Sequence, residues 1–236
     1  MDPASPFLTA AELWQKFAPF EVFGDHVVVP GGRLAYRVSV DPALLGALLG
    51  ARASSAPPLD LEVAGWLLRA GLGLVHDPAV EAVYVVGEDA VVVARTGASG
   101  GPEAVQAAAR LAGRYGSVAS VLAGRPVGAY AAVFEFPDAS VLARAVGFFQ
   151  EASEEATPRR SAAWVGAQRI GREEPFHPSM LDTLEEQTSL LESAGVNLHD
   201  LPAWWWRGAA AARVGEGAEL LDPPPPATEL LARAAG

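Results

Sequence analysis

The chain has 236 residues, a formal net charge of −11 and no cysteine, and half of its residues are hydrophobic. A chain of this length and apolar content buries a sizeable core, which excludes intrinsic disorder for its body. The absence of cysteine excludes disulfides, thiolate nucleophiles and sulfur-bound zinc, while the negative charge disfavours binding to nucleic acid or to an anionic membrane surface.

The first 78 residues are predicted to form a helix, a hairpin and two further helices. Thr9 and Glu12 fit a capping box at the start of the first helix. Two alternating stretches flank a Pro-Gly-Gly turn and are expected to pair as a hairpin. Its strands are 20–29 and 34–40, and the two helices that follow span 42–49 and 60–74.

The central region alternates strand and helix patterns with short connections. Strand 80–86 and strand 90–95 come first, joined by a tight turn. The remaining elements are a helix from Pro102 to Gly116, strands 117–123 and 127–136, a helix capped by Asp138 after Pro137, and strand 162–170. The order over residues 90–171 is β-α-β-β-α-β, which predicts an α+β fold with a ferredoxin-like sandwich, a four-stranded antiparallel sheet with both helices on one face.

The last third of the chain is less regular. We expect a helix over 178–194, a short element that opens at Trp204, an extended proline segment at 223–226 and a helix over 227–235. The chain is therefore divided into an N-terminal helix-hairpin-helix region (1–78), the sandwich (79–171) and a C-terminal helical extension with a proline-rich tail (172–236).

A glycine-rich loop, 97–101, joins a strand to a helix N-terminus, a place where phosphates can bind. A P-loop has Gly-Lys followed by Ser or Thr there, whereas this helix starts Gly101-Pro102-Glu103. Proline removes an amide donor and glutamate adds negative charge. The pattern therefore favours an ordinary connecting loop over a nucleotide site.

The four histidines, His26, His76, His177 and His199, have no metal-binding spacing. Glu173 and Glu174 lie close to His177 in the sequence, and such residues make an acid–base or metal site only if they converge in space. Solvated surface is the alternative that the spacing favours. We expect no metal, no cofactor and no catalytic residue, because a nucleophile-elbow motif is also missing.

Residues 130–136 resemble the third strand of RNA-recognition motifs, over this strand and the start of the next helix only. Those modules stack bases on outward aromatic side chains set among basic residues. Here the strand is rich in alanine and carries Glu135, with no lysine near it. RNA binding is therefore not expected from this strand.

Three consecutive indoles, Trp204, Trp205 and Trp206, are followed by Arg207. Three adjacent side chains cannot all face one core, so at least one is expected to be partly exposed. Exposed aromatic residues are common in binding hot spots, and Arg207 can stack on an indole ring. These four residues are the candidate binding site, with a tethered lid over the sheet as the alternative role.

These features favour a non-enzymatic protein that binds or assembles proteins in the cytoplasm. Its partner is expected to be a basic protein or a second copy of the chain, drawn by the acidic surface and the aromatic patch. A leader peptide and a long apolar run are not seen, so no membrane partner is expected. Two alternatives stay open: a small-ligand regulatory domain or unrecognised enzyme with a site near loop 97–101 or His177, and a structural component of a particle or virion.

Overall fold

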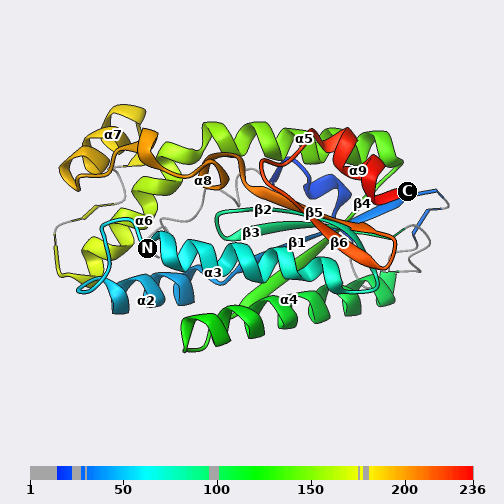
Figure 1. Ribbon diagram of the computed structural model, residues 1–236, viewed down its shortest axis with the longest axis horizontal. Helices are drawn as coiled ribbons and strands as arrows, with labels where there is room; N and C mark the ends of the chain where they lie inside the picture. The colour runs from blue at the N-terminus through cyan, green and yellow to red at the C-terminus, as the bar shows by residue number, and fades with distance from the viewer. Residues whose placement is uncertain are drawn as a thin grey trace.

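The computed structural model describes residues 15–22, 28–29, 31–95, 101–174, 176–177 and 181–235. Several sequence predictions lie outside these residues: the capping box at Thr9 and Glu12, His26, loop residues 97–100 and the first three residues of helix 178–194. The described residues form one sheet with helices on both faces (Figure 1).

The sheet has six strands in the order β4-β1-β3-β2-β5-β6, and every neighbouring pair is antiparallel. The strands are β1 (Arg33–Val40), β2 (Val80–Val86), β3 (Asp89–Ala94), β4 (Ala129–Phe136), β5 (Ala209–Val214) and β6 (Gly217–Leu221). Helices stand between β1 and β2 and between β3 and β4, so the first four strands follow the β-α-β-β-α-β order. The α+β class is confirmed, but this unit runs over residues 33–136 and not over 90–171.

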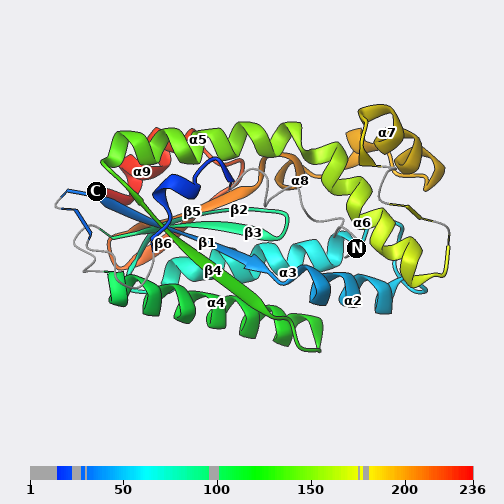
Figure 2. The same cartoon turned by 180° about the vertical axis from the view of Figure 1, so that it is seen from behind.

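Two helical layers enclose the sheet. The helical elements are η1 (Ala18–Phe20), α2 (Pro42–Arg52), α3 (Leu61–Leu72), η2 (Gly73–His76), α4 (Gly101–Ala123), α5 (Ala139–Glu155), α6 (Thr157–Gly171), α7 (Leu184–Ser193), η4 (Leu198–Asp200), α8 (Ala203–Arg207) and α9 (Ala227–Ala235). Helices α3 and α4 cover one face and α5 and α9 the other, as the opposite views in Figures 1 and 2 show. Helices α2, α6 and α7 lie beyond one end of the sheet, the end that holds the β2–β3 turn.

The predicted strand 117–123 is wrong, because helix α4 continues through it to Ala123. The sequence predicts that the helix ends at Gly116. In the structure it is buried within α4, where a Cβ atom would lie 2.9 Å from the carbonyl oxygen of Val127. Glycine is therefore needed there for the close approach of the helix to the chain that leads into β4, and it does not end the helix.

The predicted strand 162–170 is also wrong, because these residues belong to helix α6. The stretch 151–160, which precedes this predicted strand, forms the end of α5 and the start of α6. Helix α6 is buried on all sides from Arg160 to Gln168. A helix without an exposed face has no 3.6-residue polar period, so its sequence does not distinguish it from a buried strand.

The predicted hairpin of 20–29 with 34–40 does not form, since β1 pairs with β3 on one side and β4 on the other. Of the N-terminal stretch, Glu21 makes an isolated bridge to Phe134. The C-terminal extension contains the strands β5 and β6, which extend the sheet beyond β2 and were not predicted. Strands of the one sheet thus come from all three proposed segments, and the division of the chain into domains stays a prediction.

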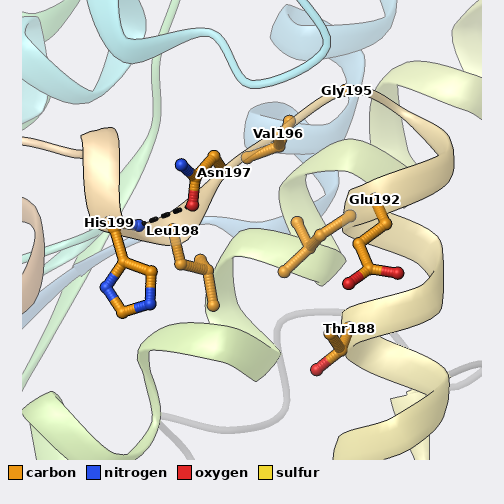
Figure 3. Close-up of a pocket in the computed structure, with 8 residues that line it drawn as sticks. Thr188, Glu192, Gly195, Val196, Asn197, Leu198 and His199 are labelled. Atoms are coloured by element: carbon orange, nitrogen blue, oxygen red, sulfur yellow. Dashed lines mark hydrogen bonds between the residues drawn. The ribbon is translucent and has the colours of Figure 1, made fainter.

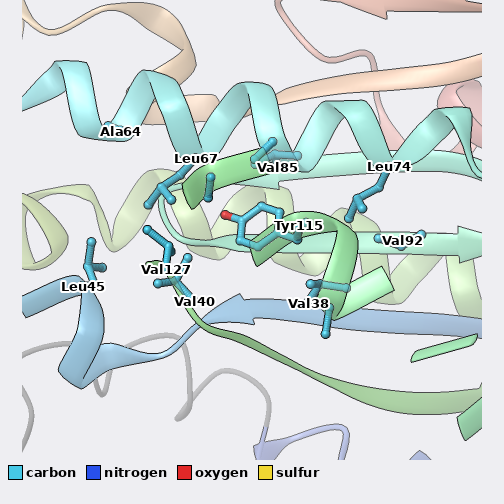
Figure 4. Close-up of a cluster of buried hydrophobic side chains, with 14 of the residues drawn as sticks. Val38, Val40, Leu45, Ala64, Leu67, Leu74, Val85, Val92, Tyr115 and Val127 are labelled. Carbon is cyan, nitrogen blue, oxygen red and sulfur yellow. The ribbon is translucent and has the colours of Figure 1, made fainter. Parts of the chain in front are cut away.

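The larger core lies between the sheet and helices α2, α3, α4 and α6. Tyr115 of α4 is fully buried near its centre, among apolar side chains from the sheet and helices (Figure 4). Its hydroxyl donates a hydrogen bond to the backbone oxygen of Glu88 over 3.3 Å. The core therefore holds the β2–β3 turn in place from one side.

Candidate functional site

A group of charged and polar side chains lies buried where the β2–β3 turn meets β1 and α6. We call it the hairpin cluster and define it as Arg37, Ser39, Glu88, Asp89 and Arg160. Each of these residues is exposed by 8% or less. Buried charges require compensation by partners, so a group of this kind is expected to be ordered.

Strand register places Asp89 at the centre of the cluster. Ser39 on β1 stands opposite Asp89 on β3, and its hydroxyl donates a hydrogen bond to Oδ1 of Asp89. The Nε atom of Arg37 donates to the same oxygen over 3.0 Å. The guanidinium of Arg37 also lies 5.8 Å from the centre of the Tyr130 ring on β4. Three neighbouring strands thus contribute to one polar site.

Glu88 occupies the turn itself, directly after Gly87, whose φ of +57° favours glycine. Burial raises the pKa of the Glu88 carboxyl to about 7, with a further contribution from the Asp89 charge, while Arg160 opposes the rise. Its Oε2 atom is buried and has no hydrogen-bond partner among the described residues. Glu88 can therefore both hold and accept a proton near neutral pH.

Arg160 closes the cluster from the side of α6. Its guanidinium donates to the Thr157 hydroxyl over 3.0 Å and to the backbone oxygens of Ser153 and Trp205, and it lies 5.2 Å from the centre of the Trp205 ring. Burial lowers the pKa of Arg160, and the nearby Glu88 acts in the opposite direction. The guanidinium is thus held by three acceptors beside the β2–β3 turn.

The cluster combines two carboxyl groups and two guanidinium groups. Such a set can attract an anionic group through the charge of its arginines and exchange a proton through Glu88. It does not supply a metal site of three protein ligands: nowhere in the described ranges do three or more histidine, aspartate or glutamate side chains come together to hold a metal ion.

The candidate binding residues 204–207 form helix α8 and its end. Trp205 is fully buried, lies 5.1 Å from Trp164 between ring centres, and donates from Nε1 to the Ser161 hydroxyl over 2.9 Å. Trp204 and Trp206 are half-buried, and Arg207 is exposed, 3.6 Å from Glu154. Two of the three indoles are therefore partly accessible, and a binding role for these residues stays a prediction.

A separate surface pocket of ≈ 490 Å³ lies between the end of α7 and η4 (Figure 3). His199 and Glu192 line it from opposite sides, and the backbone oxygen of Leu198 accepts a hydrogen bond from Nε1 of Trp206 over 3.1 Å. Asp200 does not join His199 in a site; it accepts a hydrogen bond from the amide of Asn197.

A metal site around His177, kept open above as an alternative to solvated surface, is not found among the described residues. His177 is exposed, and the carboxylate of Glu174 lies 3.9 Å from Arg169. Glu173 has a φ of +59° just beyond the end of α6.

Sequence reasoning missed every member of the hairpin cluster. One signal was present: strand 33–40 is otherwise mostly apolar, yet Arg37 and Ser39 are polar at alternate positions and so share a face of the sheet. Glu88 and Asp89 lie in the predicted tight turn between strands 80–86 and 90–95. Arg160 gives no comparable signal, because its position depends on α6, which was predicted to be a strand.

The fold is shared with solved structures. A bacterial tRNA(His) guanylyltransferase-like protein in complex with ATP aligns with a TM-score of 0.59 and 12% identity over 93% of this chain and 94% of its own. Its complex with GTP gives 0.56 and 11% over the same shares. The tRNA(His) guanylyltransferase of Saccharomyces cerevisiae gives 0.57 and 12% over 84% of this chain and 92% of its own. No protein-family model and no curated protein sequence matches the chain.

These similarities correct the function expected from the sequence. The expectation of a non-enzymatic protein-binding protein, with a role in protein–protein interaction, is contradicted because the shared fold is that of guanylyltransferases. The expectation of no nucleic-acid partner is contradicted by the same finding. Net charge averages the whole surface and does not describe a local site, so a value of −11 does not by itself exclude a nucleic-acid partner. Each helix in the described part of the chain is too short or too polar to cross a membrane.

Proposed function

We propose that this chain is an enzyme that binds a purine nucleoside triphosphate at the hairpin cluster and transfers its nucleotide to a nucleic-acid acceptor. The observation that carries the proposal is Glu88, a buried carboxyl with a pKa of about 7 and an oxygen without a hydrogen-bond partner in the described residues. Strongly perturbed carboxyls next to buried cations are typical of active sites. The fold shared with ATP- and GTP-bound structures supports a nucleotide as the ligand.

The proposed step is a nucleotidyl transfer. A hydroxyl oxygen of the acceptor forms a bond to the α-phosphorus of the triphosphate, the bond to the β-phosphate oxygen breaks, and pyrophosphate leaves. Glu88 takes the proton of the attacking hydroxyl, which its pKa near neutrality suits. Arg37 and Arg160 stabilise the negative charge that develops on the phosphate oxygens.

A second candidate is a nucleotide-binding protein that performs no transfer. It is favoured by the Arg37–Asp89 pair, which compensates one carboxylate of the cluster internally. Both candidates are expected to bind the nucleotide, so only a measurement of nucleotide transfer distinguishes them.

The test is incubation of the purified chain with tRNA and GTP or ATP labelled at the α-phosphate, followed by measurement of label in the RNA. The first candidate predicts incorporation that falls at least a hundredfold in Glu88→Gln, the size typical of losing a general base. Glu216→Gln, in the exposed β5–β6 turn, is the matched control and keeps full incorporation. Nucleotide binding without incorporation of label supports the second candidate. Absence of both nucleotide binding and incorporation overturns both candidates.

A further inference from the structure

A pocket of ≈ 260 Å³ lies at the C-terminal end of β4, between η1 and α5. We call it the phenylalanine pocket. Its lining includes four aromatic side chains and two cations: Phe17, Phe20, Phe136, Phe148, Lys16 and Arg144. In Figure 2 the N-terminal blue segment that supplies η1 lies beneath α5 and next to the sheet. All of the lining residues belong to the described part of the chain.

The walls of this pocket are hydrocarbon. The ring centres of Phe17 and Phe148 are 5.8 Å apart, and those of Phe20 and Phe136 are 5.2 Å apart. Lys16 and Arg144 carry the polar side-chain groups of the lining. A ligand with hydrogen-bonding edges would leave them unpaired against these walls, which costs free energy, so the fitting group is an aliphatic chain or hydrocarbon ring.

The two cations give the pocket a charge opposite to that of the molecule. Lys16 is the only lysine of a chain with a net charge of −11. Its Nζ atom lies 4.7 Å from the centre of the Phe148 ring, and both cations are exposed. Among the described residues neither cation forms a salt bridge with a carboxylate. The pKa of Asp138 is lowered chiefly by the Ser140 hydroxyl, with a smaller contribution from the charge of Arg144.

We propose that the phenylalanine pocket binds a small amphipathic carboxylate. Its hydrocarbon part lies among the four phenylalanine rings, and its carboxylate is paired with Lys16 and Arg144. Phe136 is six residues along β4 from Tyr130, which pairs with Ser39 of the hairpin cluster. At about 3.4 Å per residue the two sites are roughly 20 Å apart, so this binding is independent of the proposed nucleotide site.

The pocket volume limits the size of the ligand. Sites for drug-sized molecules span about 300–1,000 Å³, so ≈ 260 Å³ suits a short chain or a single ring. Burial of one methylene contributes about 0.8 kcal/mol, which is roughly a fourfold gain in affinity. Affinity for straight-chain carboxylates should therefore rise about fourfold with each methylene until the pocket is full, and then level off.

Calorimetric titration of the full chain with butanoate, hexanoate, octanoate and decanoate tests the proposal. Octanol is the uncharged control ligand. The proposal expects saturable binding of octanoate, weaker binding of octanol, and a loss of about two- to fivefold in octanoate affinity for each of Lys16→Gln and Arg144→Gln. Arg125→Gln, at an exposed arginine outside the pocket, is expected to change nothing.

Phe148→Ala removes a wall and is expected to weaken octanoate at least tenfold. Its melting temperature shows whether the variant is folded, and the two exposed cation variants test the proposal if it is not. Equal affinity for octanol and octanoate, or unchanged binding in both cation variants, overturns the proposal. Failure of octanoate to saturate the wild-type chain also overturns it. None of these results bears on GTP or ATP binding at the hairpin cluster.

Discussion

The Nε atom of Arg37 donates a hydrogen bond to Oδ1 of Asp89 over 3.0 Å, and both side chains are 10% exposed. Removing one partner of a buried pair leaves the other charge uncompensated. Asp89→Ala is therefore expected to lower the free energy of unfolding by about 3 kcal/mol, measured by urea denaturation. The apolar double variant Arg37→Met with Asp89→Leu should recover most of this loss. A single variant as stable as the wild type contradicts the assigned pair.

Gly87 is required by the conformation of the β2–β3 turn and by contact with α6. Its φ is +57°, and a Cβ atom there would lie 2.7 Å from Cδ of Arg160. Gly215, in the β5–β6 turn, has a φ of +59° and no atom within 4 Å of such a Cβ. Both alanine variants lose about 1 kcal/mol from the left-handed backbone, and Gly87→Ala loses about 1–3 kcal/mol more from overpacking. Equal losses in thermal unfolding would show that Arg160 does not approach this turn.

The pKa of Glu88 makes stability depend on pH. Its folded-state value of about 7 lies above the ordinary 4.5, so the folded chain binds this proton more tightly than the unfolded chain. The carboxyl costs nothing below pH 4.5, and its cost grows as the pH rises to about 7, where it levels off at roughly 3 kcal/mol. Glu88→Gln removes this cost.

The measurement for Glu88 is the difference in unfolding free energy between Glu88→Gln and the wild type at pH 4, 6 and 8. We expect the variant to be the more stable one at pH 8, with the difference shrinking toward pH 4. Taking the difference cancels the titration of the other carboxylates. A difference that stays constant across this range would show that folding does not raise the pKa of Glu88.

Ser161 supports Trp205 from within the buried helix α6. Nε1 of Trp205 donates to its hydroxyl over 2.9 Å, and both residues are fully buried. Ser161→Ala leaves the indole N–H of Trp205 without a hydrogen-bond partner and should lower the free energy of unfolding by about 1–3 kcal/mol. Ser189→Ala, on the exposed side of α7, is the control and should change it by less than about 0.5 kcal/mol. Matching effects of the two variants in chemical denaturation would argue against the buried hydrogen bond.

Local signals in the sequence predicted a large part of the fold. Asp138 is predicted to cap a helix, and it accepts hydrogen bonds from the backbone at the start of that helix, as Asp41 and Asp60 do at theirs. Strand 80–86 has the predicted bounds, and 90–95 differs from β3 by one residue at each end. These elements are half-exposed or bounded by strong turn residues, so the residues within and beside each one are enough to identify it from the sequence.

The remaining elements depend on tertiary packing. Helix α6 is buried on every side, which removes the polar period that identifies a helix. Strand β5 is Ala-Ala-Ala-Ala-Arg-Val, a composition that favours a helix, and it is a strand because it pairs between β2 and β6. The hairpin cluster joins residues 37 to 160, and no short motif contains them together. Its position follows only once β1 is known to pair with β3.

Calorimetric titration of GTP and ATP into the wild-type chain and into Arg37→Gln tests the central claim most directly. We expect saturable binding of at least one of the two nucleotides with a stoichiometry of one, weakened about tenfold or more in Arg37→Gln because a charged hydrogen-bond donor is lost. Arg125→Gln serves as the exposed control, and melting curves confirm that each variant is folded. Failure of both nucleotides to saturate the wild type, or equal affinity in Arg37→Gln, would contradict a nucleotide site at the hairpin cluster.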